Sequence, residues 1–253
     1  MWRFAAAQAT GSSHEKLNLP CQDRMTCFVL EDEDSLIAVV ADGAGTAGRG
    51  HEGAEVAVWT VSSIAQLGVR AGRKDYAEVL REGATLAHQR LIETATERSC
   101  TMRDLACTLL AVIVAPVGGA ALQIGDGAIV IGTESLSWHT VFWPQKGEYA
   151  NTTFFLTDEK SVSRAQTTNL PDETLDVAMF TDGLEPLALQ FSAQKAHEPF
   201  FRTTFAPLHA CNAPGESKSL SQSLAQMLTS PGARARTDDD ATLVLATRRA
   251  PSS

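Results

Sequence analysis

The stretch that decides the fold is Leu36–Gly43, which reads LIAVVADG. Its apolar run predicts a buried β-strand, and the run ends directly in Asp42 and Gly43. The same arrangement recurs at Leu122–Gly127, which reads LQIGDG, and at Val177–Gly183, which reads VAMFTDG. An apolar strand that ends in an Asp-Gly pair is therefore a repeated feature of this chain.

Carboxylates at the ends of neighbouring strands can converge on one point. A fourth acidic group, Asp238, Asp239 and Asp240, directly precedes another expected strand at Thr242–Ala246. Hard cations such as Mg²⁺ and Mn²⁺ prefer oxygen ligands and retain several waters. We therefore expect the strand-end aspartates to bind metal.

An Asp-Gly pair is also the strongest short signal for a β-hairpin turn. Asp126 lies between two expected strands, 120–124 and 128–131, and a hairpin explains it about as well as a metal site does. Asp42 and Asp182 differ, because a loop and a helix follow each of them. A functional role is favoured for these two, since strand-end loops often carry function.

The remaining patterns predict an α+β arrangement in one domain, residues 1–253, with sheets packed between helices. Two long helices are expected in the first half and one near the end. The segment 157–174 is expected to be a loop or flap, and the region of Pro199, Pro207 and Pro214 to be irregular. The other expected elements are strands at 2–8, 25–30, 107–115, 137–143 and 152–156, and helices at 54–67, 75–98 and 217–228.

Composition narrows the range of functions. The net charge is −9, from 21 Lys and Arg against 30 Asp and Glu, which argues against a nucleic-acid or anionic-membrane surface. Five cysteines without close pairing predict neither a disulfide framework nor a zinc site, and they favour a reducing compartment. No apolar run is long enough for a membrane span. We expect a cytoplasmic protein.

The motifs, in this order, resemble those of the type 2C, or PPM, family of metal-dependent serine/threonine phosphatases, in its bacterial-like branch. Each tripeptide alone is weak, whereas the ordered series in its strand context is specific. The matching segments are Cys21, Gln22 and Asp23; Ala41, Asp42 and Gly43; Cys107 and Thr108; Gly125, Asp126 and Gly127; Thr181, Asp182 and Gly183; and Asp239, Asp240, Ala241 and Thr242.

The resemblance implies a four-layer α-β-β-α sandwich, with two antiparallel sheets flanked by helices. It also implies hydrolysis of phosphoserine and phosphothreonine in proteins by a water that two Mn²⁺ or Mg²⁺ ions activate. Asp42 would bridge the ions, with the Gly43 carbonyl as a ligand of one and Asp182 and Asp239 as ligands of the other. Asp126 would help Asp182 hold a third, weaker ion.

The resemblance further implies that Asp23 orients metal-bound waters, so that the expected catalytic set is Asp23, Asp42, Asp182 and Asp239. The expected partners are a phosphoprotein substrate and a cognate serine/threonine kinase, with no nucleic acid and no membrane.

Two family features are absent. Many members carry an arginine shortly before the early acidic motif to hold the phosphate, but residues 11–20 contain none. His14 or Lys16 could supply a positive donor there, although a lysine lacks the bidentate geometry of arginine. Animal members place a histidine directly after the central Asp-Gly, where this chain has Ala44. Protonation of the leaving group is left to His51 or to a metal-bound water.

Other hydrolase classes fit poorly. Asp238–Thr242 matches the Asp-x-Asp-x-Thr nucleophile motif of haloacid-dehalogenase-like phosphatases, but that motif follows a first strand and this one precedes the last. No cysteine is followed by arginine at the spacing of tyrosine phosphatases, and no P-loop is present. The remaining alternative is a catalytically weak relative that serves as a regulatory or binding module.

Overall fold

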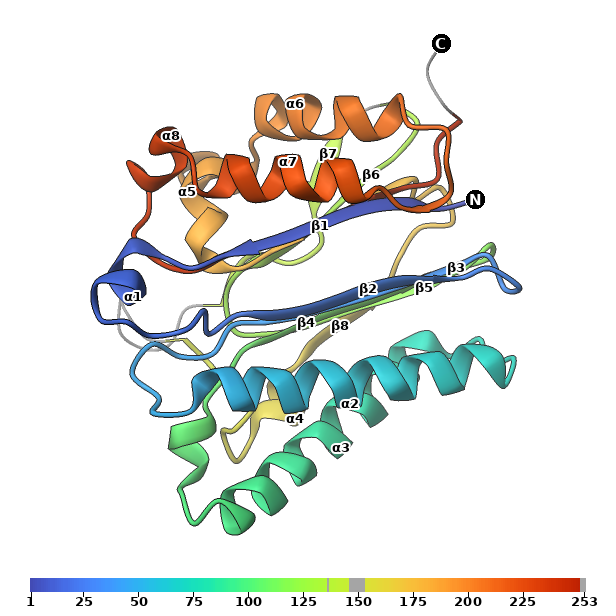
Figure 1. Ribbon diagram of the computed structural model, residues 1–253. Coiled ribbons are helices and arrows are strands. Elements are labelled where there is room, and N and C mark those ends of the chain that lie inside the picture. The colour runs from blue at the N-terminus through green and yellow to red at the C-terminus, as the bar shows by residue number, and fades with distance from the viewer. Residues whose placement is uncertain (136, 146–152, 251–253) are drawn as a thin grey trace.

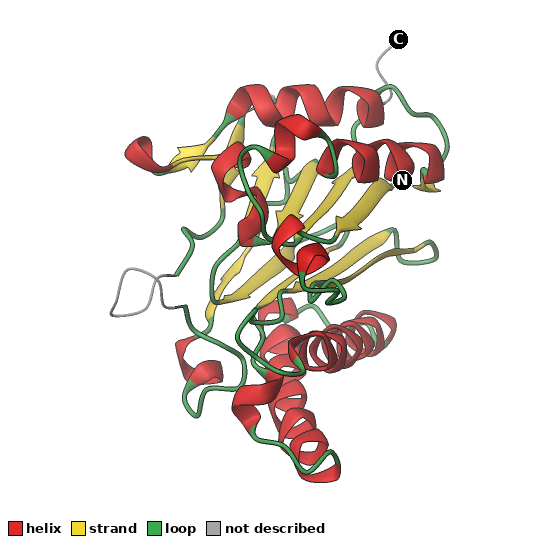
Figure 2. Ribbon diagram, turned by 60° about the vertical axis from the view of Figure 1, so that its left-hand side comes forward, coloured by secondary structure: helices red, strands yellow, loops and turns green. Residues whose placement is uncertain are grey.

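Two β-sheets stacked face to face form the centre of the molecule, and helices cover both outer faces (Figure 1). This computed structural model describes residues 1–135, 137–145 and 153–250. Figure 2 shows the same layers from the side, with helices above and below the stacked strands. The expected four-layer α-β-β-α sandwich is confirmed.

The first sheet has six strands in the order β12-β1-β13-β9-β6-β7, and the second has five in the order β2-β3-β4-β5-β8. Neighbouring strands are antiparallel except for the two-residue β12, which pairs parallel with β1. The strands of the first sheet are β1 (Arg3–Ala9), β6 (Ala128–Gly132), β7 (Trp138–Thr140), β9 (Asp176–Phe180), β12 (Gly215–Glu216) and β13 (Ala241–Thr247). Those of the second are β2 (Arg24–Leu30), β3 (Ser35–Ala41), β4 (Leu109–Val114), β5 (Gly119–Ile124) and β8 (Gln166–Asn169).

The helices form the two outer layers. In Figure 1, α2 and α3 lie below the five-stranded sheet, and α6 and α7 lie above the six-stranded sheet. The helices are α1 (Ser12–Lys16), α2 (Gly50–Arg70), α3 (Tyr76–Glu97), α4 (Ser161–Arg164), α5 (Glu185–Ala188), α6 (Glu198–His209), α7 (Lys218–Leu228) and α8 (Pro231–Arg234). Short 3₁₀ turns are η1 (Met102–Leu105), η2 (Asp182–Leu184) and η3 (Phe191–Ala193), and β10 (Leu189–Gln190) pairs with β11 (Lys195–Ala196).

Strand β3 is apolar throughout because both of its faces are covered. Its residues Ile37, Val39 and Ala41 pack against the core under α2 and α3. Alternate residues, such as Leu36 and Val40, pack in the core between the two sheets. A strand buried on both faces reads as a continuous apolar run, which explains the pattern that ends in Asp42.

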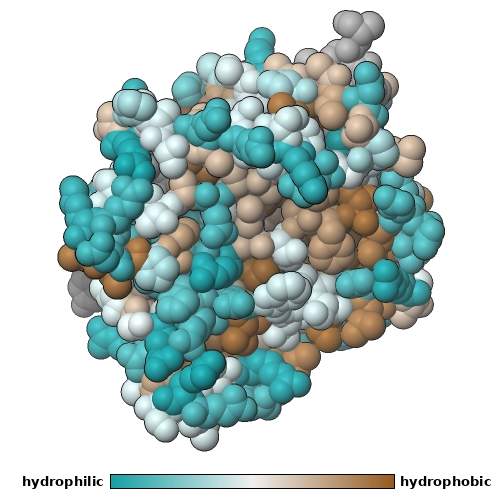
Figure 3. Space-filling view, in the orientation of Figure 1, coloured by the Kyte–Doolittle hydropathy of each residue, from teal (hydrophilic) through white to brown (hydrophobic). Residues whose placement is uncertain are grey.

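The surface agrees with this layered core. On the face seen in Figure 3, hydrophobic residues gather in the middle right, at the level of the stacked sheet edges, and hydrophilic residues cover most of the remainder. None of the helices in the described part of the chain has the length and apolarity that crossing a membrane requires.

The expected hairpin around Gly125–Gly127 is wrong. Strand β5 belongs to the five-stranded sheet and β6 to the six-stranded sheet, so the chain crosses between sheets at Asp126. Gly125 and Gly127 have φ angles of 94° and 74°, a region that favours glycine. The Asp-Gly pair therefore lies in a connection between the two sheets rather than in a two-residue turn. A hairpin turn does not explain Asp126.

Three further expectations need correction. The described part of the expected strand 152–156 is not a strand, since Leu156 instead donates its backbone N–H to Cys107 O; residue 152 lies outside the described part. The expected flap 157–174 contains α4 and the edge strand β8. The proline-rich region contains α6, because Pro199 occupies the first turn, where no N–H is needed, and Phe201, Phe205 and Leu208 form a buried face.

The crossover gives a prediction about stability. A Cβ at Gly127 would lie 2.5 Å from the carbonyl oxygen of Phe180, in addition to the cost of the positive φ. Gly127→Ala should therefore destabilise the protein by more than the roughly 1–3 kcal/mol of backbone strain alone. Thermal unfolding checks this, with a shift of roughly 2–4 °C expected per kcal/mol.

Gly72→Ala is the matched control, because Gly72 has a φ of 75° but no heavy atom within 4 Å of an added Cβ. Gly72→Ala should lower the stability of the protein less than Gly127→Ala does. Equal losses for the two variants would show that packing at the crossover does not constrain residue 127.

Candidate metal centre

The strand ends that lead into the aspartates lie at one side of the sandwich, on the left in Figure 1 near α1. Asp42 directly follows β3, Asp126 lies in the crossover from β5 to β6, and Asp182 begins η2 after β9. These segments belong to different sheets, so the site lies where the edges of the two sheets meet.

Three of the predicted metal ligands converge. Asp42, Asp126 and Asp182 each offer a carboxylate oxygen, and the three oxygens lie within 4.8 Å of one another. All three side chains are half-buried. Three carboxylates at this spacing are a donor set suited to a hard cation.

Mutual repulsion and partial loss of water perturb these carboxylates. Burial, together with the charges of Asp126 and Asp239, raises the pKa of Asp182 to about 8. Burial also raises the pKa of Asp42 well above its usual range, helped by the charges of Asp23, Asp182 and Asp239. Grouped carboxylates shift this way when no cation compensates them.

Asp23 is fully buried and held by two threonines. Its Oδ2 accepts hydrogen bonds from Thr181 Oγ1 at 2.8 Å and from Thr242 Oγ1 at 2.7 Å. Burial raises the pKa of Asp23 to about 6, although both hydroxyls lower it. Its Oδ1 has no hydrogen-bond partner among the residues described. Both threonines belong to the sequence motifs, but the sequence did not show that they hold Asp23.

Asp239 lies close to this group but outside the converging trio. Its Oδ1 accepts a hydrogen bond from the backbone N–H of Asp240 at 2.8 Å. Burial and the charges of Asp240 and Asp238 raise the pKa of Asp239, whereas the charge of His14 lowers it. Its own charge raises the pKa of both Asp42 and Asp182. Its role as a metal ligand stays a prediction.

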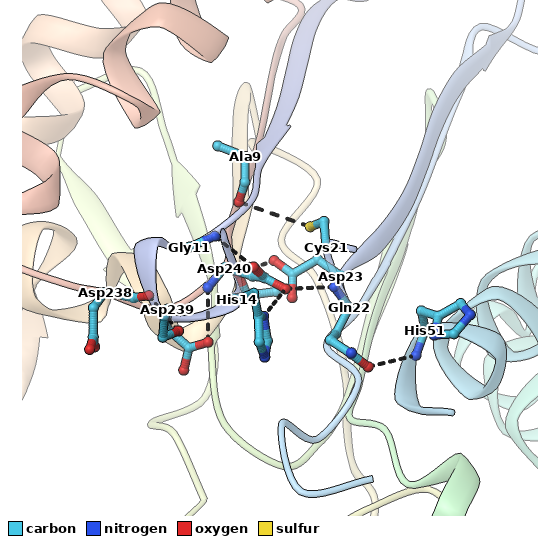
Figure 4. A network of polar contacts seen from close by, with 12 residues as sticks. Ala9, Gly11, His14, Cys21, Gln22, Asp23, His51, Asp238, Asp239 and Asp240 are labelled. Carbon is cyan, nitrogen blue, oxygen red and sulfur yellow. Dashed lines mark hydrogen bonds and ion pairs between the residues drawn. The ribbon is translucent and has the colours of Figure 1, made fainter. Parts of the chain in front are cut away.

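Asp240 joins three segments of the chain at the site (Figure 4). One carboxylate oxygen accepts the backbone N–H of Gly11 at 2.7 Å, and the other accepts that of Gln22. His14 Nδ1 lies 3.0 Å from Asp240 Oδ2. The sequence placed Asp240 in the closing motif, Asp239 to Thr242, but its partners could not be read from that motif.

Gln22 and Glu185 support the loops that carry Asp42 and Asp126. The side-chain oxygen of Gln22 accepts the backbone N–H of His51 at 3.0 Å, and its backbone carbonyl accepts that of Gly43 at 3.3 Å. Glu185 accepts the backbone N–H of Gly127 at 3.0 Å and so fixes the crossover that carries Asp126. Glu185 was missed because a glutamate before a proline looks like an ordinary helix start.

The predicted positive donors have different positions. His14 is buried beside Asp240, whereas Lys16 is exposed on α1. The imidazole of His51 extends away from Asp23 and Asp239 in Figure 4, which does not favour His51 as the acid for the leaving group. Ala44 is buried in the loop after Gly43 and offers no titratable group.

The residues present fit a divalent metal. The Asp182 Oδ1 atom is buried without a hydrogen-bond partner in the described part of the chain, although it faces other carboxylates. Unpaired buried oxygen atoms in an acidic group are costly unless a cation satisfies them. The backbone carbonyl of Gly43, directly after Asp42, is suitably placed in sequence to add a neutral oxygen.

The raised pKa of Asp182 predicts a pH dependence. An unfolded aspartate titrates near about 3.9, so without metal the folded state holds more protons than the unfolded state up to about pH 8. The free energy of unfolding of metal-free protein should therefore fall as pH rises through this window. Thermal unfolding from pH 5.5 to pH 8, without metal and with Mn²⁺, should show that Mn²⁺ stabilises more at the higher pH.

Asp182→Asn should remove much of this pH dependence and most of the response to Mn²⁺. Asp32→Asn, in the exposed turn between β2 and β3, should preserve both. The interpretation is contradicted if Asp182→Asn retains the wild-type pH slope.

The comparisons with known proteins agree with this geometry. Residues 10–229 match the family model described as Protein phosphatase 2C. The Escherichia coli (strain K12) protein named serine/threonine-protein phosphatase 3 is 39% identical over 249 residues, which are 97% of this chain and 98% of that protein.

Solved structures share the fold. A bacterial serine phosphatase aligns with a TM-score of 0.66 at 12% identity, covering 99% of each chain. The serine/threonine phosphatase Stp1 from Staphylococcus aureus aligns with a TM-score of 0.63 at 14% identity, covering 98% of this chain and 96% of that one. Given the match over most of its length and the conserved layout of the sheets, this chain belongs to the protein phosphatase 2C family.

Proposed function

We propose that this phosphatase hydrolyses phosphoserine and phosphothreonine in proteins with Mn²⁺ or Mg²⁺ ions held by Asp42, Asp182 and Asp239. The Gly43 carbonyl completes this set, and Asp126 with Asp182 holds a third, weaker ion. The observation that carries the proposal is the convergence of the Asp42, Asp126 and Asp182 carboxylates within 4.8 Å. Segments far apart in sequence supply these carboxylates, so it is the fold that brings them together.

Each residue of the chain has a distinct task in this proposal. When bound, the ions supply the positive charge that makes a water nucleophilic and stabilises charge on the phosphate. Asp23, fixed by Thr181 and Thr242, has an Oδ1 without a hydrogen-bond partner among the described residues, and this oxygen orients water at the site. Hydrolysis breaks the ester bond between phosphorus and the Ser or Thr oxygen, and water supplies the new oxygen on phosphorus and the proton on the alcohol.

The substrate is proposed to be a phosphoprotein, supplied by a serine/threonine kinase. The name of the Escherichia coli relative supports this class of substrate. We place substrate selection in residues 157–174, because α4 and β8 present this segment at the edge of the scaffold and such segments often carry specificity.

We also propose that residues 1–253 form one phosphatase domain that acts in the cytoplasm. The core between the sheets contains residues from both halves of the chain, which supports one domain. All five cysteines are free, as is usual in a reducing compartment.

The alternative is a phosphatase-like module that binds partners without turnover. A Mn²⁺-dependent assay with p-nitrophenyl phosphate and a phosphothreonine peptide separates the two. We expect activity in the wild type and a loss of at least about 100-fold in Asp182→Asn, beyond the roughly 10–100-fold typical of residues that only support a ligand. Asp32→Asn should stay near wild type.

Wild-type turnover no greater than that of Asp182→Asn would rule out the enzyme and favour the binding module. Mn²⁺ titration followed by thermal unfolding would then still report whether the site binds metal.

Two of the three consecutive aspartates, Asp239 and Asp238, provide a test variant and its matched control. Asp239→Asn should weaken the Mn²⁺ dependence of turnover by roughly 10-fold or more, because a predicted ligand is removed. Asp238→Asn, at a neighbour that is exposed like Asp239 but is not a predicted ligand, should have little effect. Half-saturating Mn²⁺ concentrations for both variants provide the measurement, and a larger effect at Asp238 would reassign the ligand.

A further inference from the structure

The ring of His14 lies against the carboxylate of Asp240 inside the site rather than at its surface. The side chain of His14 is 9% exposed and that of Asp240 is 2% exposed, and His14 Nδ1 lies 3.0 Å from Asp240 Oδ2. The pair connects α1 to the residue directly before β13. A buried pair of this kind costs desolvation, so it requires an explanation beyond general stability.

The partners of Asp240 require a carboxylate. Its Oδ1 accepts the N–H of Gly11 and its Oδ2 accepts the N–H of Gln22, so a backbone donor faces each oxygen. An asparagine would turn its amide NH₂ toward one of these donors. The backbone N–H groups of Gly11 and Gln22 therefore favour a carboxylate, with its negative charge, beside His14.

The other ring nitrogen of His14, Nε2, lies beside the loop that follows Gly43. A Cβ at Gly45 would lie 3.7 Å from His14 Nε2, with no other heavy atom within 4 Å. Gly45 is exposed and follows Gly43 by two residues. No hydrogen bond within the described ranges uses His14 Nε2. Asp240 therefore constrains one side of the ring, and the opposite side remains available to a ligand over the Gly43–Gly45 loop.

We propose that His14 is a substrate-binding residue whose Nε2–H donates to a phosphate oxygen, and that Asp240 is its positioning residue. The inference rests on the proposed function, because it assigns the phosphate of that substrate to this space. Phosphate oxygens accept charge-assisted hydrogen bonds, and the surrounding carboxylates offer no donor of their own when ionised. A histidine fixed by a carboxylate supplies the donor in a defined direction.

Two substitutions of His14 distinguish the roles of its two ring nitrogens. His14→Asn can keep a donor near the position of Nδ1, toward Asp240, but loses the one at Nε2. His14→Gln can place a donor near the position of Nε2. With p-nitrophenyl phosphate at saturating Mn²⁺, His14→Asn should raise KM and the inhibition constant of inorganic phosphate by about 10-fold or more. His14→Gln should recover part of both, and kcat should change less than KM.

Asp240→Asn should raise KM in the same direction. Combined with His14→Asn, it should add less than its separate effect, because both act through one hydrogen bond to substrate. His139→Asn, at an exposed histidine of β7, is the control and should match the wild type.

Three outcomes would overturn the assignment. With an active wild type, unchanged KM and phosphate inhibition in both His14 variants would show that His14 does not touch phosphate, and the proposed function would stand. Recovery by His14→Asn but not by His14→Gln would assign His14 a structural role only. A wild type without Mn²⁺- or Mg²⁺-dependent turnover would instead remove the proposed function, and this inference with it.

Discussion

The structure depends on one electrostatic constraint, the gathering of several carboxylates at the edge where two sheets meet. Asp42, Asp126 and Asp182 bring oxygens within 4.8 Å of one another, and Asp23 and Asp239 add negative charge nearby. Such a group raises its own pKa values and weakens the fold unless cations compensate it. The rest of the scaffold can be understood as the means of holding these groups in place against repulsion.

The sandwich holds them by anchoring each loop to a different part of the chain. Thr181, directly after β9, and Thr242, in β13, lie at the two central strands of one sheet and fix Asp23, which precedes the edge strand of the other. Asp240 fixes Gly11 and Gln22 through their backbone N–H groups, and Glu185 fixes the crossover at Gly127. Buried polar side chains with partners on different segments can therefore connect the layers of the fold.

Sequence patterns predicted much of this, and their failures have physical causes. The apolar runs before Asp42 and Asp182 identified buried strands, and motif order identified the family. The hairpin at Asp126 was wrong because an Asp-Gly pair reports a turn in the chain but not which sheet the next strand joins. Helix α6 was missed because Pro199 and Pro207 outweighed the helical spacing of Phe201 and Phe205. The contacts of Asp240, His14 and Glu185 depend on tertiary packing, which no local pattern contains.

The central claim is that the carboxylate group is a metal centre, and crystals soaked in Mn²⁺ test it most directly. Anomalous diffraction should show two Mn²⁺ peaks about 3.5–4 Å apart, between the Asp42, Asp182 and Asp239 side chains, because paired cations at this spacing serve hydrolytic sites. Peaks confined to exposed acidic side chains, with none touching Asp42 or Asp182, would contradict the account.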